Sequence, residues 1–316
     1  MRAAIIGLGK VAWGYDKGHF TSTKAVSHLS ALLQAGLDVI GGADPNQIAR
    51  QEFSDSTGIS SYEKVKDLLA LKPEMVSIAS PKEFHAEHCA FCLDKGVKYI
   101  WLEKPATDDP VKTQSLAAQA RLRNARVMVG FQRRYMSSYG ALKTTALGNL
   151  KAIEITYSLG LETNGAHMLD LLLWLLEGES LRLKGVVKGP FQPVHARELC
   201  PSFLLESSSG IPINVTGLDL DYHSIDILVH YSDGRREVRH GGQTKLFETK
   251  SPNPLFPSFY FLESEDGVQD ISYEVESVFP VMLKDLLYGS NKEPISNLTS
   301  AALGQSLIEK ILTECA

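Results

Sequence analysis

The chain has 316 residues and a formal net charge of −5, and its content of 44% hydrophobic and 22% charged residues is ordinary for a globular protein of two domains. The charge supplies no basic surface for nucleic acid and no polybasic patch for a membrane. No apolar run reaches the roughly 18 residues of a membrane span.

The N-terminal residues lead straight into a strand and leave no room for a signal peptide, which predicts a cytoplasmic protein. Four cysteines agree with a reducing compartment: Cys89, Cys92, Cys200 and Cys315. Cys89 and Cys92 form a C-x-x-C, and His85 and His88 share that spacing, so a redox or metal site is one alternative. Because the stretch predicts a crossover helix and no second pair follows, we expect packed thiols and no metal.

A short apolar strand, Ala3–Ile6, leads directly into a glycine-rich turn of the form G-x-G-x-x-A, which is typical of dinucleotide-binding folds. The first glycine makes a tight turn, the second lets a pyrophosphate approach the backbone, and the alanine keeps the next helix close to the sheet. The N–H groups at the start of that helix suit phosphates. The predicted cofactor-binding residues here are Gly7, Gly9, Lys10, Val11 and Ala12.

A second strand, Leu37–Asp44, ends in an acid where this fold places a carboxylate on the adenosine ribose. Asp44 would repel a 2′-phosphate and therefore favours NAD over NADP, although it could instead only form a turn and cap the next helix. It lies 32 residues beyond Ala12, where about 20 is usual. The excess is the segment 13–24, which either overhangs the cofactor, reaches the substrate or is a tolerated surface insertion.

Strands and helices then alternate up to residue 131, which predicts a parallel, doubly wound sheet over residues 1–131. Further strands are expected at Glu74–Ala79, Val97–Leu102 and Arg126–Phe131, with helices at Ala49–Thr57, Tyr62–Leu71, Glu83–Lys95 and Pro110–Asn124. Pro105 ends the strand that precedes Lys104. Lys104 thus lies at the carboxyl end of a central strand, where ligands bind. It is either a solvent-exposed surface residue or a functional amine.

The pattern changes after Phe131, and residues 132–316 predict an α+β domain with a large, mainly antiparallel, open-faced sheet. Helices are expected from Gln132 to about Gly148 and at Asn164–Glu177, Tyr273–Tyr288 and Thr299–Glu314, of which the last could pack back toward the first domain. Strands are expected at Lys151–Leu159, Leu181–Lys188, Ser202–Ser208, Ile213–Leu218, Ser224–Tyr231 and Arg235–Arg239. The open face favours a homodimer or homotetramer built sheet to sheet. Segments 13–24 and Gly241–Pro257 are where loop-borne specificity would lie.

Six motifs in order resemble the Gfo/Idh/MocA family over essentially the whole chain. They are Gly7-x-Gly9-x-x-Ala12, Ala43-Asp44-Pro45, Ile78-Ala79-Ser80-Pro81 followed by His85, Glu103-Lys104-Pro105, Gly130-Phe131-Gln132-Arg133-Arg134-Tyr135, and Gly165-x-His167-x-x-Asp170. The resemblance implies a Rossmann domain and an α+β substrate domain. It also implies NAD-dependent hydride transfer at a secondary alcohol or ketone carbon of a sugar, cyclitol or sugar derivative.

The resemblance implies roles for individual residues as well. Lys104 matches the family lysine that contacts the substrate hydroxyl and the nicotinamide ribose, and His167 matches the histidine beside the substrate. The nicotinamide half of the site would be lined by Ser80, Pro81, His85 and Glu103. Candidate substrate residues are Arg133, Arg134, Tyr135, Thr163, Asn164 and Asp170.

Alcohol oxidation removes a proton from oxygen and a hydride from carbon, and a nicotinamide takes the hydride. A histidine carries protons near neutral pH and a lysine can stabilise a developing alkoxide. We therefore assign His167 as general acid/base and Lys104 as the polarising group, although the roles could be exchanged. Many family members have an aspartate four residues before this histidine, where this chain has Thr163. Asp170 could partner His167 instead, or only bond nearby backbone.

The missing acid leaves alternatives open. The chemistry could depend on Lys104 and His167 alone, or the protein could be a catalytically silent NAD-binding sensor or regulatory protein. A reductase of a non-sugar carbonyl or imine is a third reading.

Overall fold

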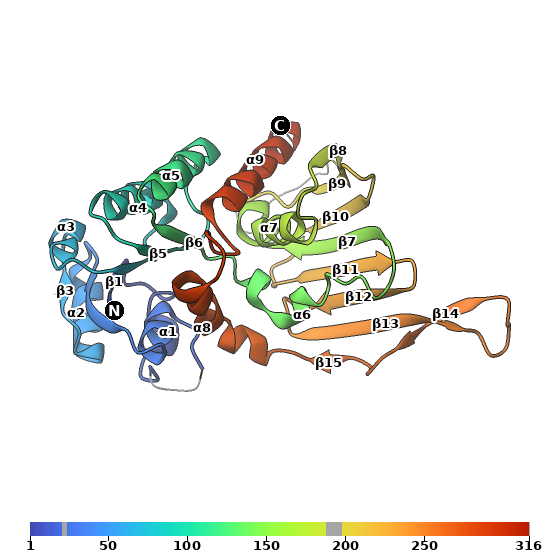
Figure 1. Cartoon of the computed structure of the whole chain (residues 1–316), viewed down its shortest axis with the longest axis horizontal. Helices are drawn as coiled ribbons and strands as arrows, with labels where there is room; N and C mark the ends of the chain where they lie inside the picture. Colours follow the sequence, from blue (N-terminus) through green and yellow to red (C-terminus); the bar gives the residue numbers. More distant parts are fainter. Residues whose placement is uncertain (21–23, 188–197, 316) are drawn as a thin grey trace. The chain divides into compact units, whose positions relative to one another are not determined.

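The computed structural model describes residues 1–20, 24–187 and 198–315. The expected strand end at Lys188 and residues 21–23 of segment 13–24 therefore lie outside the described residues. The chain forms two compact units, each with its own β-sheet (Figure 1). Unit 1 comprises Met1–Tyr135 and Glu276–Gln305, and unit 2 comprises Met136–Val275 with the residues from Ser306 onward. Within the described ranges, no helix is both long enough and apolar enough to cross a membrane.

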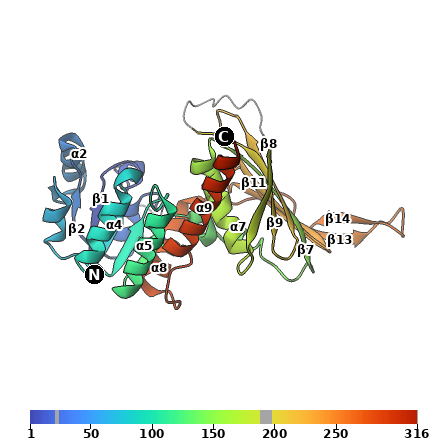
Figure 2. The same cartoon turned by 90° about the horizontal axis from the view of Figure 1, so that it is seen from above.

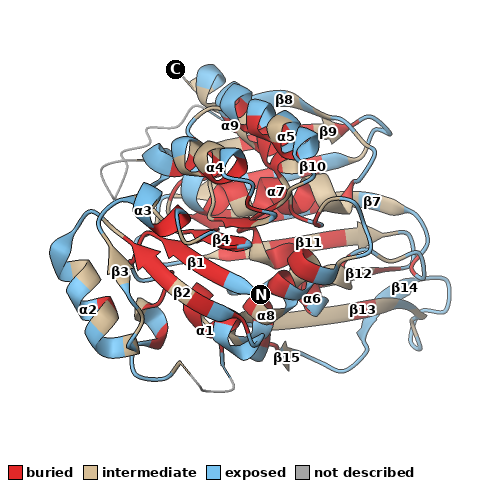
Figure 3. Ribbon diagram, turned by 60° about the vertical axis from the view of Figure 1, so that its left-hand side comes forward, coloured by how far each residue is buried: buried red, intermediate tan, exposed pale blue. Residues whose placement is uncertain are grey.

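Unit 1 contains six parallel strands in the order β3-β2-β1-β4-β5-β6, which confirms the predicted doubly wound sheet. The strands are β1 (Arg2–Ile6), β2 (Asp38–Ala43), β3 (Ser61–Tyr62), β4 (Met75–Ile78), β5 (Tyr99–Leu102) and β6 (Arg126–Val129). β3 lies where the helix Tyr62–Leu71 was expected to begin, because its two residues pair with Gly42 and Ala43 of β2. Figure 3 shows β1, β2 and β4 as largely buried strands.

The α-helices of unit 1 are α1 (His28–Gln34), α2 (Gln47–Thr57), α3 (Val65–Leu69), α4 (His85–Asp94), α5 (Pro110–Leu122), most of α8 (Tyr273–Tyr288) and the first part of α9 (Leu298–Cys315). Cys89 and Cys92 are fully buried on α4. Burial raises the pKa of the Cys89 thiol to about 12 and that of Cys92 well above its ordinary value. The expectation of packed thiols on a crossover helix is thereby confirmed.

The long spacing between the glycine-rich turn and Asp44 has a simple structural cause. The N–H groups of His28 and Leu29 donate to the carbonyls of Val11 and Ala12 at 3.0 and 2.8 Å, as successive turns of one helix would. Residues 13–26 thus interrupt that helix after its first turn. Subtracting these 14 residues from the 32 leaves 18, close to the roughly 20 of the usual motif.

Part of the inserted segment packs against the glycine-rich turn. Trp13 is buried, its Nε1 donates to the carbonyl of Leu8 at 2.8 Å, and its ring meets Phe53 of α2 edge-on at 5.7 Å. The first residues of the insertion are therefore anchored beside the predicted pyrophosphate turn.

Residues 276–305 were expected in the second domain, but they pack within unit 1. The guanidinium of Arg126 donates to the carbonyls of Leu286 and Asp285, each at 2.8 Å. The hydroxyl of Tyr135 donates to Asp285 Oδ2 at 2.8 Å, and the ring of Phe279 meets Trp101 edge-on at 5.2 Å. These long-range contacts bind the segment to β5 and β6.

The expected helix from Gln132 to about Gly148 does not form, which is a correction. A single 3-10 turn spans Gln132–Tyr135, and α6 covers only Ser137–Gly140. Met136 between them has extended backbone, with φ −86° and ψ 130°. The start of α6 is bound instead by Glu274, whose carboxylate accepts from both Ser137 and Ser138.

Unit 2 contains a nine-stranded sheet in the order β14-β13-β12-β11-β7-β10-β9-β8, with β15 paired to β13. Its strands are β7 (Leu150–Ser158), β8 (Leu181–Val187), β9 (Ser202–Ser207), β10 (Pro212–Leu218), β11 (Ile225–Tyr231), β12 (Gly234–Arg239), β13 (Thr244–Pro252), β14 (Tyr260–Ser264) and β15 (Gln269–Asp270). All pairings are antiparallel except that of β7 with β10, which confirms the mainly antiparallel sheet.

One face of this sheet is covered by α7 (Ala166–Leu175) (Figure 2). Along β7, Ile153, Ile155 and Tyr157 are buried on that face, whereas Glu154 on the other is exposed. The last helix, α9, spans Leu298–Cys315.

The segment Gly241–Pro257, where loop-borne specificity was expected, is largely a strand. Nine of its residues form β13, which pairs with β12 on one side and β14 on the other. Figure 1 shows β13 as one strand of a projecting hairpin with β14.

Candidate functional site

The glycine-rich turn at the end of β1 is tightly packed at its first glycine and open at its second. Gly7 has a φ of +86°, and a Cβ there would lie only 2.5 Å from the backbone N of Ser80. A Cβ on Gly9 would meet no described atom within 4 Å. The arrangement matches the separate tasks of the two glycines: one permits the turn, and the other leaves space for a ligand close to the backbone.

Asp44 lies directly beside this turn. Its Oδ2 accepts from the backbone N–H of Leu8 at 2.9 Å, and its Oδ1 accepts from that of Asn46 at 2.8 Å. The guanidinium of Arg50 donates to the carbonyls of Asp44 and Pro45 at 2.8 and 2.9 Å. The cap of α2 is supplied by the side chain of Asn46, so Asp44 is not needed for that purpose.

Glu103 is held by a histidine that the sequence analysis did not single out. The ring of His28 is fully buried, with Nε2 3.0 Å from Glu103 Oε1 and Nδ1 2.6 Å from the hydroxyl of Ser77. It stacks on Trp101 at 3.9 Å between ring centroids. Gly130 leaves the necessary room, because a Cβ there would lie 2.5 Å from Glu103 Oε1.

Electrostatics keep Glu103 ionised in this partly buried position. Burial alone acts to raise the pKa of Glu103, but the hydrogen bond and charge of His28, together with the charge of Lys104, outweigh it and lower the pKa. Glu103 is thus a fixed negative charge at the end of β5, next to Lys104.

His85 holds the other side of the same turn. Its Nδ1 lies 2.7 Å from the carbonyl oxygen of Pro105 and its Nε2 lies 2.7 Å from that of Ser80. Because a carbonyl oxygen can only accept, the ring of His85 is the donor in these contacts. The hydroxyl of Ser80 lies 2.9 Å from His88 Nδ1.

The turn that carries Lys104 is therefore anchored at both flanking residues. Glu103 is fixed by His28, and Pro105 is fixed by His85. All these groups follow the carboxyl ends of β1, β2, β4 and β5, which share one edge of the parallel sheet. The structure thereby brings together the following residues predicted from the sequence: Gly7, Gly9, Lys10, Val11, Ala12, Asp44, Ser80, Pro81, His85, Glu103 and Lys104.

The three residues after Gln132 differ in their surroundings. Arg134 donates to the carbonyl of Ile295 at 2.9 Å, and Tyr135 is bound to Asp285, so both hold the C-terminal part of unit 1 together. Arg133 is 5% exposed, and its Nε has no hydrogen-bond partner among the described residues.

The remaining candidates belong to unit 2, at the start of α7. His167 is the second residue of α7 and is half-buried, while Asn164 and Asp170 are 7% and 2% exposed. Thr163 is exposed within a five-residue π-helical turn, Leu161–Gly165, that runs directly into α7. Its hydroxyl donates to Glu198 Oε1 at 2.7 Å, a contact that the sequence analysis missed.

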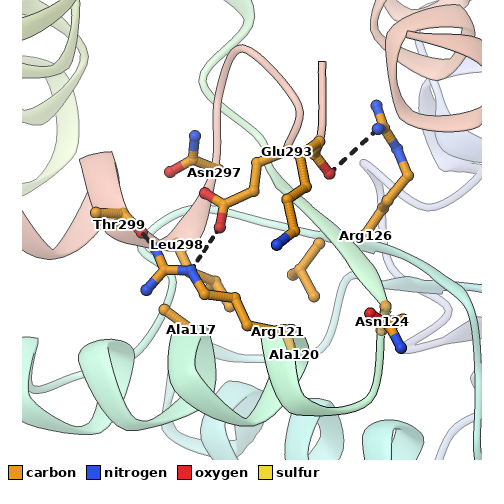
Figure 4. A pocket seen from close by; sticks show the side chains of 12 residues that line it. Ala117, Ala120, Arg121, Asn124, Arg126, Glu293, Asn297, Leu298 and Thr299 are labelled. Atoms are coloured by element: carbon orange, nitrogen blue, oxygen red, sulfur yellow. Dashed lines mark hydrogen bonds and ion pairs between the residues drawn. The ribbon is translucent and has the colours of Figure 1, made fainter. Parts of the chain in front are cut away.

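A separate pocket of about 240 Å³ lies in unit 1 beside the start of β6 (Figure 4). Arg121 on its rim donates to Glu293 at 2.7 Å and to the hydroxyl of Thr299 at 2.6 Å. Because β6 begins at Arg126, the pocket is at the amino edge of the sheet, opposite the glycine-rich turn. It is therefore distinct from the predicted cofactor site.

The sheet order, the glycine-rich turn and the acid beside it define a dinucleotide-binding Rossmann protein. Comparison with known families agrees: residues 1–131 match the Gfo/Idh/MocA family, described as an oxidoreductase family with an NAD-binding Rossmann fold. The family model matches the Rossmann part of the chain, residues 1–131, and there it confirms the resemblance noted in the sequence.

Individual relatives extend the similarity into the second unit. The chain is 26% identical over 228 residues to a D-glucoside 3-dehydrogenase of Escherichia coli, a match that covers 64% of this chain and 61% of that protein. It is 29% identical over 196 residues to an inositol 2-dehydrogenase of Streptomyces avermitilis, covering 56% of each. The match thus spans only about three fifths of the length of these relatives.

Solved structures share the complete fold. The WlbA dehydrogenase of Bordetella pertussis, crystallised with NADH and UDP-GlcNAcA, aligns over 100% of this chain and 95% of its own, with a TM-score of 0.79 and 15% identity. At that identity the likeness establishes the fold of both units.

Proposed function

We propose that this protein is an NAD-dependent dehydrogenase that transfers a hydride between a nicotinamide and a secondary alcohol or ketone carbon of a sugar, cyclitol or sugar derivative. The observation that carries the proposal is the doubly anchored turn around Lys104, at the same sheet edge as the glycine-rich turn. The sugar and cyclitol dehydrogenases among the relatives support the substrate class.

The residues present fit a dinucleotide. Gly9 leaves open space for a pyrophosphate, and the carboxylate of Asp44 lies beside the turn, where a ribose diol would donate to it. Bound NAD would supply the hydride acceptor, which is the chemistry that no side chain provides. Ser80 and Pro81 follow β4 at this edge and are proposed to line the nicotinamide half.

Lys104 is proposed to hold the reacting hydroxyl and stabilise its developing negative charge. The fixed charge of Glu103 beside it favours the cationic form of the lysine. His167 is proposed as the general acid/base that takes the hydroxyl proton in oxidation and returns it in reduction. Glu103 and His85 are positioning residues in this scheme, because their polar atoms bind His28 and main-chain carbonyls.

The proposal is tested by assaying the purified protein with sugars, cyclitols, sugar acids and nucleotide sugars, following the absorbance of NADH, and by the reverse reaction with the matching ketones. Hydride transfer to or from at least one of these classes is expected. NAD binding by calorimetry with no turnover on any of them would favour a silent sensor. Turnover only of non-sugar carbonyls or imines would favour the reductase alternative.

The cofactor preference is expected to depend on Asp44. In the wild-type protein, kcat/KM should be higher with NAD than with NADP, because the carboxylate repels a 2′-phosphate. Asp44→Ser should lower the NAD:NADP ratio of kcat/KM by about 10- to 100-fold, with Arg50 left nearby to meet the phosphate. Asp55→Ser, an acid elsewhere on α2, serves as the control. A wild-type preference for NADP would contradict this role of Asp44.

We also propose that the protein is a homodimer or homotetramer joined through the bare face of the unit 2 sheet. That face carries Leu204, which is 38% exposed. The adjacent β13–β14 hairpin exposes Phe256 and Phe259 by 61% and 65%. Exposed apolar side chains of this kind mark interaction surfaces.

Light scattering after size-exclusion chromatography is expected to give twice or four times the 34.7 kDa of one chain. Leu204→Glu should shift the protein toward monomer, because it places a charge in the proposed interface. Leu122→Glu, at an 82% exposed position of α5, should leave the assembly unchanged. A monomeric wild-type protein would rule out the interface.

A cytoplasmic location is also proposed, because none of the four cysteines forms a disulfide.

A further inference from the structure

A carboxylate from a distant part of the chain lies on the helical turn that precedes His167. Glu198 Oε2 accepts from the backbone N–H of Thr163 at 2.9 Å, and Oε1 accepts from the hydroxyl of the same residue at 2.7 Å. Both carboxylate oxygens are thus occupied by one residue. Hydrogen bonds to a carboxylate are stronger than those between neutral groups.

The backbone around Glu198 is built to hold it there. The N–H of Leu161 donates to the carbonyl of Leu199 at 2.9 Å, and the N–H of Gly160 donates to Cys200 Sγ at 3.0 Å. Gly160 has a φ of +96°, and a Cβ on it would lie 2.0 Å from Glu198 Oε2. Only a glycine at position 160 leaves room for this carboxylate.

The geometry of the helix connects the carboxylate to His167. The turn Leu161–Gly165 continues without a break into α7, and Thr163 and His167 are four residues apart along it. Residues at this spacing share one face, with about 5–6 Å between their Cβ atoms. The first turn of a helix also favours a negative charge, through its unbonded N–H groups and its dipole.

We propose that Glu198 is a positioning residue for His167, supplying at the Thr163 position the carboxylate that the side chain there lacks. The hydroxyl and backbone N–H of Thr163 bind the carboxylate of Glu198. The negative charge of Glu198 is thereby held one helical turn before His167. The inference rests on the proposed function, in which His167 carries the proton. It also explains how a chain with threonine at this position retains an acid.

The first test is Glu198→Gln, which keeps the shape of the side chain and removes its charge. We expect kcat with the best substrate to fall about 100-fold, with the KM for NAD unchanged. Glu162→Gln, which neutralises the exposed acid next to Thr163, is the matched control and should leave kcat unchanged. An unchanged kcat in Glu198→Gln would overturn the proposal.

The second test moves the carboxylate to the other partner. In the double variant Thr163→Asp with Glu198→Gln, the glutamine amide can donate to the new aspartate, so the hydrogen bond is kept while the charge transfers to position 163. We expect kcat to recover at least 10-fold over Glu198→Gln. If kcat stays low although both variants melt at the wild-type temperature, the carboxylate is only a structural anchor and the proposal fails.

A readout that does not depend on turnover separates this inference from the proposed function. The ring ¹⁵N shifts of His167, assigned with His167→Gln, should change in Glu198→Gln and return toward wild type in the double variant, while Glu162→Gln leaves them unchanged. Shifts that do not respond to Glu198→Gln would overturn the inference even in an active enzyme. A protein with no turnover on any substrate but with responding shifts would overturn only the proposed function.

Discussion

Lys104→Ala is expected to lower kcat by about 10²- to 10⁴-fold while NAD still binds. The proposed contacts with the adenosine half of the cofactor come from β1 and β2, through Gly9 and Asp44, and none of them involves the lysine. The amine follows β5, where it would hold the reacting hydroxyl. Steady-state kinetics with the best substrate, together with calorimetric titration of NAD, measure the two effects separately.

Lys98→Ala is the matched control for this prediction. Lys98 precedes β5 at the opposite edge of the sheet, is exposed, and donates to the carbonyl of Arg123 at 3.3 Å. The Lys98→Ala variant should have the same kcat and NAD affinity as the wild-type protein. Full activity of Lys104→Ala would contradict the proposed mechanism. A loss of NAD affinity equal to the loss of kcat would instead assign the lysine to cofactor binding.

The sequence predicts best those parts of the fold whose pattern is contained in a short stretch of neighbouring residues. Apolar strands that alternate with helices gave the parallel sheet, and the G-x-G-x-x-A motif gave its first turn. The failures occurred where long-range partners decide the structure. Gln132–Tyr135 does not continue into a long helix because Arg134 and Tyr135 bind Ile295 and Asp285, which lie 161 and 150 residues away.

The candidate site shows the same division between local and distant signals. Lys104 and Asp44 were predictable because each follows a recognisable strand. His28 was not, because it lies 75 residues from Glu103 and the inserted segment 13–26 separates it from the glycine-rich turn. Glu198 was missed for the same reason: a single acid in an irregular stretch gives no signal until folding brings it to Thr163. Single residues that support a site from a distant part of the sequence can be identified only from the three-dimensional structure.

Replacing each of the two glycines of the pyrophosphate turn by alanine is expected to have a different effect on stability and on NAD binding. Gly7→Ala should reduce the free energy of unfolding by about 2–5 kcal/mol, because a Cβ at φ +86° would meet the backbone of Ala79 and Ser80 at 2.5–2.6 Å. Backbone atoms cannot rotate away as a side chain can, so the turn itself must move, and NAD binding should be lost with it. Chemical denaturation and calorimetric NAD titration check both effects.

Gly9→Ala should leave the unfolding free energy within about 1 kcal/mol of wild type, because no described atom lies within 4 Å of its new Cβ. NAD affinity should nevertheless fall about 10- to 100-fold, since the methyl group occupies the space through which a pyrophosphate reaches the backbone. Gly96→Ala provides the control: Gly96 has a positive φ of +78°, as Gly7 does, but its Cβ would have no neighbour within 4 Å, and it lies far along the chain. It should cost about 1 kcal/mol and leave NAD binding intact. Unchanged NAD affinity in Gly9→Ala would show that the pyrophosphate does not bind at this turn, because the empty space above Gly9 is what marks it as the binding position.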